Sequence, residues 1–266
     1  MSNCYCLPGR AGGSPGWTSR NGGMVHPASA RQVLPCRPML QKVRLGMAET
    51  HRTILHICCS IVIMAQSHRD ASLQLFEVAQ QQQGYFTTKQ AKAAGFAENT
   101  HPYHVQAGNW AREHRGIYRL IQFPATDRPD LALWSLWSSN RKEEVEGVYS
   151  HQTAISLFDL SDLNPAKLHM TVPRGFRRNS KLPGILVLHY ADVPASDTQT
   201  GPGYTYTRPL RTIIDLIEAG DVQRNFIRQA LAQAVDRGMI TRQQLREAQM
   251  AETTRKIVDE MLRQAA

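Results

Sequence analysis

A short run of polar side chains that can form directed hydrogen bonds begins at Asn99. It contains Asn99, Thr100, His101, Tyr103 and His104. An asparagine amide can make two hydrogen bonds to the edge of adenine, and a threonine methyl can contact the methyl group of thymine. The run contains no Arg or Lys, so it is suited to discriminate between bases but attracts phosphates weakly. Such attraction has to come from the flanking segments.

Side chains that can contact phosphates flank this run on both sides. They are Thr88, Lys89, Lys92, Arg112, Arg115 and Arg119. Hydroxyl and cationic groups of this kind fix a protein on the sugar–phosphate backbone without reading the sequence. Two interpretations remain open at this point. Either the flanking groups and the central run form one DNA interface, or the cations are ordinary solvated surface charges.

The residues from Ser72 onward predict the helices that would position these groups. Four apolar residues are expected on the buried face of a helix that ends at Gly84, namely Leu73, Leu75, Phe76 and Ala79. Thr87 and Gln90 have the spacing of a capping box, which predicts that a second, short helix begins there. Gly95 is expected to close that helix.

A third helix and a β-ribbon are expected next. The helix begins at about Asn99 as its N-cap, and Pro102 in its first turn loses no hydrogen bond there. Two β-prone stretches then surround Arg115-Gly116, where the glycine supplies the positive φ of a tight turn. Trp110 and Tyr118 are expected to hold the ribbon against the helices. Three short helices followed by a ribbon is the order of a winged helix-turn-helix.

The remainder of the chain predicts a mixed α/β domain. Helices are expected around 131–137, after Ser150, over 209–219 and over 222–237, and strands over 167–172 and 185–189. Thr241 and Gln244 form another capping box. The predicted fold class is therefore α+β, with a winged helix-turn-helix at 70–121, an α/β domain at 130–250 and a C-terminal helical tail at 251–266.

Four cations cluster after the first of these strands, and they are Arg174, Arg177, Arg178 and Lys181. They are interpreted either as a second nucleic-acid contact or as a solvated loop.

Catalytic motifs are missing from the sequence, which contains no nucleophile elbow, P-loop or zinc-protease helix. His101 and His104 lie three residues apart without a third ligand nearby. The sequence therefore predicts a protein that is not an enzyme and that uses no metal or cofactor.

The first 63 residues differ from all that follow. They contain all five cysteines and seven of the cationic side chains against Glu49 alone, which accounts for +6 of the net charge of +9. They are also rich in Gly, Pro and Ser. Either they form a disordered tail, or translation begins at Met64 or Met47 and the upstream residues are an over-extended reading frame. Mass spectrometry of the native N-terminus distinguishes the two.

Cysteine usage and hydropathy indicate the compartment. The chain after residue 63 has no cysteine, so no disulfide framework is expected there and the cytoplasm is the predicted location. The longest apolar run, residues 54–65, has twelve residues and includes two polar side chains, His56 and Ser60. A span of the bilayer needs about 20 residues, so a soluble protein without a membrane segment is expected.

Several segments together resemble the AbiEi-type antitoxins of bacterial type IV toxin–antitoxin, or abortive-infection, systems. In the first part they are Gly84-Tyr-Phe-Thr-Thr-Lys-Gln-Ala91, Ala94-Gly95, Tyr103-His104, Ala107-Gly108, Trp110 and His114-Arg-Gly-Ile-Tyr-Arg119. In the second part they are Ser150-His-Gln-Thr-Ala154, Leu168-His-Met-Thr-Val-Pro173 and Thr207-Arg-Pro-Leu-Arg-Thr-Ile-Ile-Asp-Leu216. The resemblance covers about residues 70–247. The order and spacing of the segments are a more specific signal than any single segment.

The resemblance implies a regulator with two activities. One is autorepression, in which the winged helix binds double-stranded DNA at the protein's own operator. The other is an antitoxin activity of the second domain, which opposes a nucleotidyltransferase toxin without a stable complex. Two alternatives are an orphan winged-helix regulator without a toxin and a protein-interaction module in which the ribbon binds a protein. The operator sequence, the oligomeric state and the identity of a toxin do not follow from the residues.

Overall fold

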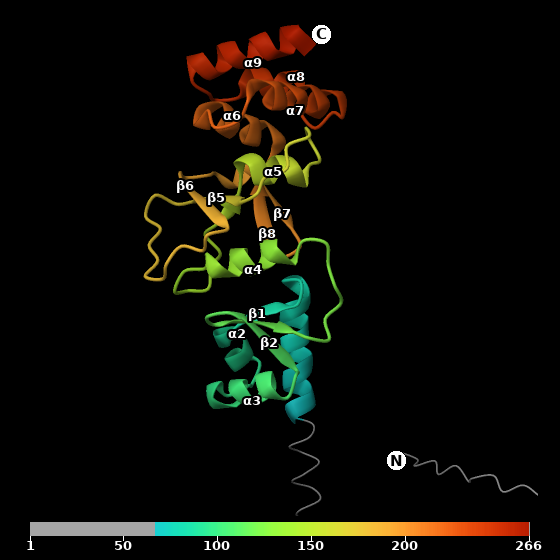
Figure 1. The fold of residues 1–266 in the computed structure, drawn as a ribbon, viewed down its shortest axis with the longest axis vertical. Coiled ribbons are helices and arrows are strands. Elements are labelled where there is room, and N and C mark those ends of the chain that lie inside the picture. Colours follow the sequence, from blue (N-terminus) through green and yellow to red (C-terminus); the bar gives the residue numbers. More distant parts are fainter. Residues whose placement is uncertain (1–66, 266) are drawn as a thin grey trace, which may run out of the picture. The chain divides into compact units, whose positions relative to one another are not determined.

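The structure is a computed structural model that describes residues 67–265. The two interpretations of residues 1–63, with start sites at Met47 or Met64, concern a segment outside these described residues. Within them the chain contains both helices and sheets, so the expected α+β class is confirmed (Figure 1). No helix among the described residues has the length and apolar character that crossing a membrane requires.

The first part of the described chain contains three α-helices, one 3-10 turn and three strands. In order they are a helix over residues 67–81, β1 (Tyr85–Thr87), α2 (Thr88–Ala93), the 3-10 turn η1 (Glu98–Thr100), α3 (His101–Gln106), β2 (Trp110–His114) and β3 (Ile117–Leu120). The strands form an antiparallel sheet in the order β1-β3-β2. Strand β1 was not expected, because three residues are too few to show an alternating pattern.

Local hydrogen bonds explain where α2 and the hairpin turn occur. The Thr87 hydroxyl accepts from the Gln90 backbone N–H at 3.2 Å, and the Gln90 side chain accepts from the Thr87 N–H at 2.8 Å. This capping box confirms the predicted start of α2. Gly116 has φ +77° at the turn between β2 and β3, which confirms the expected hairpin turn.

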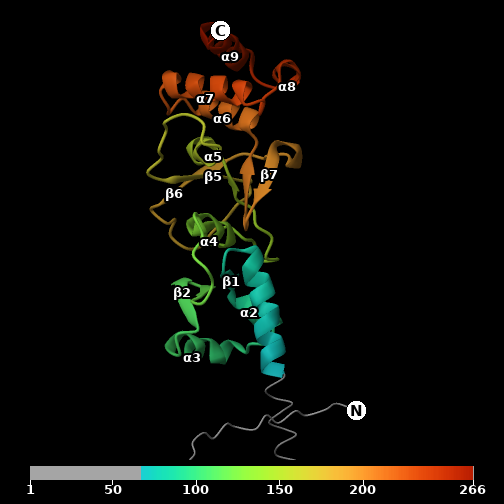
Figure 2. The same ribbon diagram turned by 90° about the vertical axis from the view of Figure 1, so that its right-hand side faces the viewer.

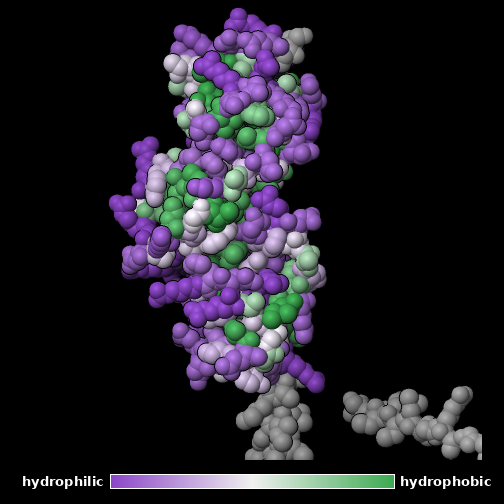
Figure 3. All heavy atoms as spheres, viewed as in Figure 1, coloured by the Kyte–Doolittle hydropathy of each residue, from purple (hydrophilic) through white to green (hydrophobic). Residues whose placement is uncertain are grey.

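Two details of the predicted helices are wrong. Leu75 and Ala79 are buried, but Leu73 is 63% exposed and Phe76 is 44% exposed, and apolar side chains reach the surface near this helix (Figure 3). Leu73 is two residues from Leu75, which places it about 160° away around the helix. The third helix begins at His101 rather than at Asn99, because η1 precedes it and Thr100 occupies the N-cap position without a side-chain bond.

The second part is built on a mixed sheet of five strands. Its elements up to the last strand are α4 (Pro129–Trp137), β4 (Val148–Tyr149), α5 (His151–Leu157), β5 (Leu168–Val172), β6 (Leu186–Tyr190), the 3-10 turn η2 (Ala195–Asp197), β7 (Thr198–Gly201) and β8 (Tyr204–Thr207). The strand order is β6-β5-β4-β8-β7. The predicted strands correspond to β5 and β6, whereas β4 and the polar β7–β8 hairpin were not predicted.

Helix α4 lies between the two sheets (Figures 1 and 2). It contacts β1 and β3 on one side and β8 on the other. Tyr85 and Ile117 of the first sheet belong to the same buried cluster as Leu131 of α4 and Met170 of β5. This shared apolar core joins the two predicted domains.

The tip of the β7–β8 hairpin makes a second contact with the first part. The Gln83 side-chain amide donates to the carbonyl of Pro202 at 2.7 Å. Gly203 follows with φ +77°, and a Cβ atom there would lie 2.9 Å from the Cα atom of Gln82. Only glycine fits this close approach of two backbones.

The last four helices share an apolar core with Ile155 of α5 and with Leu160. They are α6 (Pro209–Ala219), α7 (Arg224–Asp236), α8 (Arg242–Glu247) and α9 (Glu252–Ala265). The predicted capping box of Thr241 and Gln244 is present at the start of α8 and is therefore confirmed. Val258 and Met261 of α9 are buried with residues of α6 and α7. The segment expected as a C-terminal tail is thus packed against the preceding helices.

Candidate nucleic-acid interface

The two faces of the sheet β1-β3-β2 are covered by different elements. On one face Phe86, Trp110 and Tyr118 pack with the helix over 67–81, α2 and the 96–105 region, which confirms the expected core role of Trp110 and Tyr118. On the other face Tyr85 and Ile117 pack toward α4. Side chains alternate along a strand, so the position of each candidate on its strand decides which neighbours it meets.

The two histidines of α3 form part of the core. His101 is 2% exposed, and its Nε2 donates to the carbonyl of Phe96 at 3.2 Å. His104 is 7% exposed and stacks on Trp110 with ring centroids 4.5 Å apart. Burial lowers the pKa of His104, so its ring is neutral at physiological pH. The expectation that these two histidines contact bases is wrong, because their rings face the sheet.

The opposite face of η1 and α3 is exposed. Asn99 and Tyr103 lie on it, and Tyr103 is 67% exposed. Thr100 is half-buried, and its hydroxyl donates to the carbonyl of Ala97 at 2.6 Å. The helix therefore presents an amide and a phenol to solvent while its histidines fix it against Trp110.

Arg112 lies on the side of the sheet against which α3 packs. It is exposed, and it stands opposite Tyr118 in the β2–β3 ladder. The ring of Tyr118 in turn contacts the ring of His101 at 5.7 Å. Since paired residues point to the same side of a sheet, Arg112 is directed to the side on which α3 packs, near the N-terminal half of that helix.

Arg119 is directed to the other side of the same sheet. It pairs with Tyr85 and Ala111 in the two ladders, and Tyr85 packs toward α4. Its Nε also lies 3.0 Å from a carboxylate oxygen of Glu113. Arg119 is thus separated from the exposed face of α3, and its charge is compensated. Its contact with DNA stays a prediction, and this placement puts it on a different face of the sheet from Arg112.

The other predicted phosphate contacts occupy three different settings. Thr88 is half-buried, and its hydroxyl donates to the carbonyl of Gly116 at 3.3 Å. The Lys89 ammonium donates to the carbonyl of Arg141 at 2.7 Å. Lys92 and Arg115 are exposed. Lys92 and Arg115 therefore remain available to a ligand, while Thr88 serves to join α2 to the hairpin turn.

The second basic patch is brought next to the hairpin turn. The guanidinium of Arg178 lies 5.2 Å from the centroid of the Trp137 ring. Arg174 makes a long, solvent-exposed ion pair of 4.0 Å with Asp192, and Arg177 and Lys181 are exposed. A cleft of about 830 Å³ is lined by Lys89 and Arg115 of the first predicted set, by Arg177 and Arg178 of the second, and by Arg141, which was not predicted. The spacing of these residues in the sequence does not predict that the two sets adjoin.

The sequence also gave no sign of a histidine cluster in the second part. The rings of His151 and His189 stack with centroids 3.6 Å apart, and His169 Nδ1 lies 3.1 Å from His189 Nε2. Burial lowers the pKa of all three, that of His151 to about 3. These residues come from α5, β5 and β6, so only the folded chain brings them together.

This cluster holds no arrangement suited to catalysis or metal binding in the described part of the chain. Ser150 Oγ lies 2.8 Å from His151 Nδ1 and 2.7 Å from Thr171 Oγ1. Ser150 occupies the N-cap position of α5 as expected, but its hydroxyl makes no cap bond because it makes these contacts. It is fully buried and therefore inaccessible to a substrate. No group of three or more His, Cys, Asp or Glu side chains among residues 67–265 is arranged to hold a metal ion.

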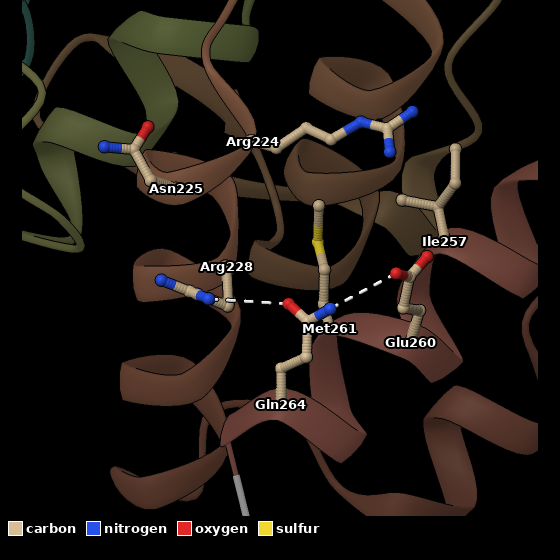
Figure 4. A pocket seen from close by; sticks show the side chains of 7 residues that line it. All are labelled: Arg224, Asn225, Arg228, Ile257, Glu260, Met261 and Gln264. Carbon is tan, nitrogen blue, oxygen red and sulfur yellow. Dashed lines mark hydrogen bonds between the residues drawn. The ribbon is translucent and has the colours of Figure 1, made fainter.

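A smaller pocket of about 170 Å³ lies between α7 and α9 (Figure 4). Gln264 crosses it, since its side chain accepts from Arg228 at 3.4 Å and donates to Glu260 at 3.2 Å. Three of its polar side chains, those of Arg228, Glu260 and Gln264, are thus bonded to one another. This pocket is better explained as a seam between two helices.

Comparisons with known proteins agree with this description of the first part. A crystal structure of the RV2827C protein from Mycobacterium tuberculosis superimposes with a TM-score of 0.51 over 74% of this chain and 77% of that chain, at 12% identity, which indicates a shared fold. A search among curated proteins found no match. The profile of a family described as "Transcriptional regulator, AbiEi antitoxin" matches residues 73–121, the segment that contains β1 to β3. The family resemblance seen in the sequence is confirmed for this segment, which is similar to the AbiEi antitoxins described as transcriptional regulators.

Proposed function

We propose that this protein is a transcriptional autorepressor and antitoxin whose first part is a winged helix-turn-helix. In this proposal α3 enters the major groove of the protein's own operator DNA, and the second part opposes a nucleotidyltransferase toxin without forming a stable complex with it. A regulator of bacterial DNA acts in the cytoplasm. No catalysis, metal or cofactor forms part of the proposal.

One observation carries the DNA-binding half of the proposal. The face of η1 and α3 that carries Asn99 and Tyr103 is open, and the histidines on the opposite face of α3 fix the helix to the sheet. Arg112 is exposed and points to the side of the sheet on which α3 packs. Winged helix proteins read DNA with a helix fixed in this way, while nearby cations contact phosphates. The match of this segment to a family of transcriptional regulators supports the same conclusion.

The two arginines on opposite faces of the sheet provide a matched test. We expect Arg112→Ala to weaken binding to all DNA sequences and to flatten the slope of log affinity against log salt by about 0.9, the value for one phosphate contact. Arg119→Ala removes the same charge from the other face and should leave the slope unchanged. Fluorescence anisotropy with duplexes from upstream of the gene, at several KCl concentrations, measures both. Equal slopes for the two variants would contradict the proposed orientation.

Sequence discrimination is expected to depend on Asn99 instead. Asn99→Ala should reduce the preference for upstream DNA over a scrambled duplex by roughly 5- to 100-fold, because a well-placed bidentate contact is worth about 1–3 kcal/mol of discrimination. Binding to the scrambled duplex and its salt dependence should change little. If the wild-type protein binds neither duplex in a salt-sensitive manner, the ribbon belongs to a protein-interaction module, and the proposed function is wrong.

The antitoxin half of the proposal is tested through the neighbouring reading frames. We expect one of them to encode a nucleotidyltransferase that stops bacterial growth when it is expressed alone. Co-expression of this protein should restore growth, and the two proteins should not co-purify. Arg112→Ala serves as the control, since it lowers DNA binding without altering the second part. A neighbourhood with no such toxin would favour an orphan regulator that retains the DNA-binding activity.

A further inference from the structure

We infer that the cleft between the β2–β3 turn and the loop joining β5 to β6 is a second phosphate-binding surface. It would hold the backbone of double-stranded DNA beside the stretch that α3 contacts, so that one duplex spans both parts of the protein. This inference rests on the proposed function and extends the DNA site to residues that the family match does not cover.

The charge of the cleft favours an anionic ligand. Five cationic side chains line it, against two acidic ones, Glu143 and Glu146. Both acids already accept hydrogen bonds, Glu143 from Thr87 at 2.9 Å and Glu146 from Asn140 at 3.4 Å. None of the five cations has a carboxylate within ion-pair distance among residues 67–265. Five positive charges against two negative ones leave the cleft with a net charge of +3, which attracts phosphates.

Two of the cations are held in place before any ligand arrives. The Lys89 ammonium bonds to the carbonyl of Arg141, a neutral acceptor that leaves its charge uncompensated. The guanidinium of Arg178 lies over the ring of Trp137, a favourable cation–π geometry. Fixing long side chains in advance lowers the entropy lost when a ligand binds. This is the behaviour expected of a built binding surface rather than of scattered solvated charges.

The position of the cleft favours a duplex over a small phosphate compound. Its cations come from four segments of the chain and line an extended cleft instead of surrounding one point. Arg115, at one edge of the cleft, lies three residues from Arg112 of the proposed interface. A duplex carries a phosphate charge about every 1.7 Å along its axis. A backbone held at Arg112 can therefore continue to Arg115 and into the cleft.

The inference is tested with duplexes of two lengths. One has about 10 base pairs, roughly the stretch that a single recognition helix occupies, and the other has about 30. The cleft variant is Arg141→Ala with Arg177→Ala, two exposed residues whose side chains make no hydrogen bond in the described structure. The control is Arg224→Ala with Arg242→Ala, which removes the same charge from exposed positions of α7 and α8.

We expect the cleft variant to bind the long duplex roughly 10- to 100-fold more weakly than the wild type, with a salt slope lower by about 1.8. The control variant should bind it like the wild type, and all three proteins should bind the short duplex alike. A cleft variant that matches the control on the long duplex overturns the inference. Equal losses on both duplexes also overturn it, because the cations would then act within the footprint of α3.

Two further outcomes separate this inference from the proposed function. If Arg112→Ala has no effect but the cleft variant weakens binding to the long duplex, the cleft is supported and the role of α3 is wrong. If wild-type protein binds neither duplex, both are wrong. Polyglutamate serves as a second anionic probe. A cleft variant that loses affinity for polyglutamate but not for DNA shows that the cleft accepts an acidic polypeptide, which overturns the assignment to nucleic acid.

Discussion

Replacing Trp110 with alanine is expected to lower the free energy of unfolding by about 3–5 kcal/mol, the usual cost of removing a large buried ring. Trp110 is 3% exposed. Its ring contacts those of Phe86, Phe96 and His101 at 5.0 to 5.2 Å and stacks on His104. Removing it takes away the surface on which α3 is held. Urea denaturation followed by fluorescence measures the loss.

The exposed aromatic residue of the same helix provides the control. Tyr103→Ala should change the free energy of unfolding by less than about 0.5 kcal/mol, as is usual for a solvent-exposed position. It should nevertheless weaken DNA binding, because the side chain lies on the proposed contact face. If Tyr103→Ala destabilises the protein as much as Trp110→Ala does, the assignment of the two faces of α3 is wrong.

Acid is expected to destabilise the second part through its histidine cluster. An unfolded histidine titrates near 6.5, but burial lowers the pKa of His151 to about 3, with further lowering by His189, His169 and Arg211. The folded state therefore binds fewer protons than the unfolded chain below pH 6.5. The stability from the neutral ring is fully present above pH 6.5 and is lost as the pH falls toward 3. Between pH 6.5 and 5, His151 alone should remove about 2 kcal/mol of stability.

Protonation of His169 and His189 should also lower the stability of the folded state in acid, whereas protonation of Asp215 should raise it. The pKa values of His169 and His189 are lowered mainly by burial, although Asp221 raises both of them in part. Burial raises the pKa of Asp215 to about 6. Protonation of this carboxyl therefore increases the stability of the folded protein as the pH falls through 6. A comparison between wild type and a single-site variant removes this opposing contribution, because Asp215 is present in both.

His151→Asn is the appropriate variant for that comparison. His151 has φ +50°, a conformation that asparagine tolerates better than most residues. We expect the variant to lose about 2 kcal/mol less stability than the wild type between pH 6.5 and 5. Thermal or urea unfolding at the two pH values measures this difference. Parallel pH profiles for the two proteins would show that the pKa of His151 is the same in the folded and unfolded states, contrary to the burial described above.

Interactions between residues close in the chain could be predicted from the sequence. The capping boxes at Thr87 and Thr241 and the turn at Gly116 were all found in this way. Each depends on groups no more than four residues apart, so the types and spacing of the residues suffice. The α+β class followed from the same local signals. The order of the helices and the hairpin in the first part followed from the order of these signals along the chain.

The direction in which side chains point depends on partners far away in the chain. His101 and His104 were expected to face DNA, but the large apolar surface of Trp110 draws their rings inward. Arg112 and Arg119 look equivalent in the sequence, yet the pairing of β3 with β1 and β2 places them on opposite faces of the sheet. A pattern of single residues does not record which strands will pair.

The sequence by itself thus determined the starts of α2 and α8, the turn between β2 and β3 and the supply of cations. Only the tertiary structure decided which cations share a surface, as Lys89 and Arg177 do in the cleft, and it alone assembled His151, His169 and His189. The physical reason is that capping and turn energies are local. Burial and long-range strand pairing are properties of the whole chain, and they determine which side chains become neighbours.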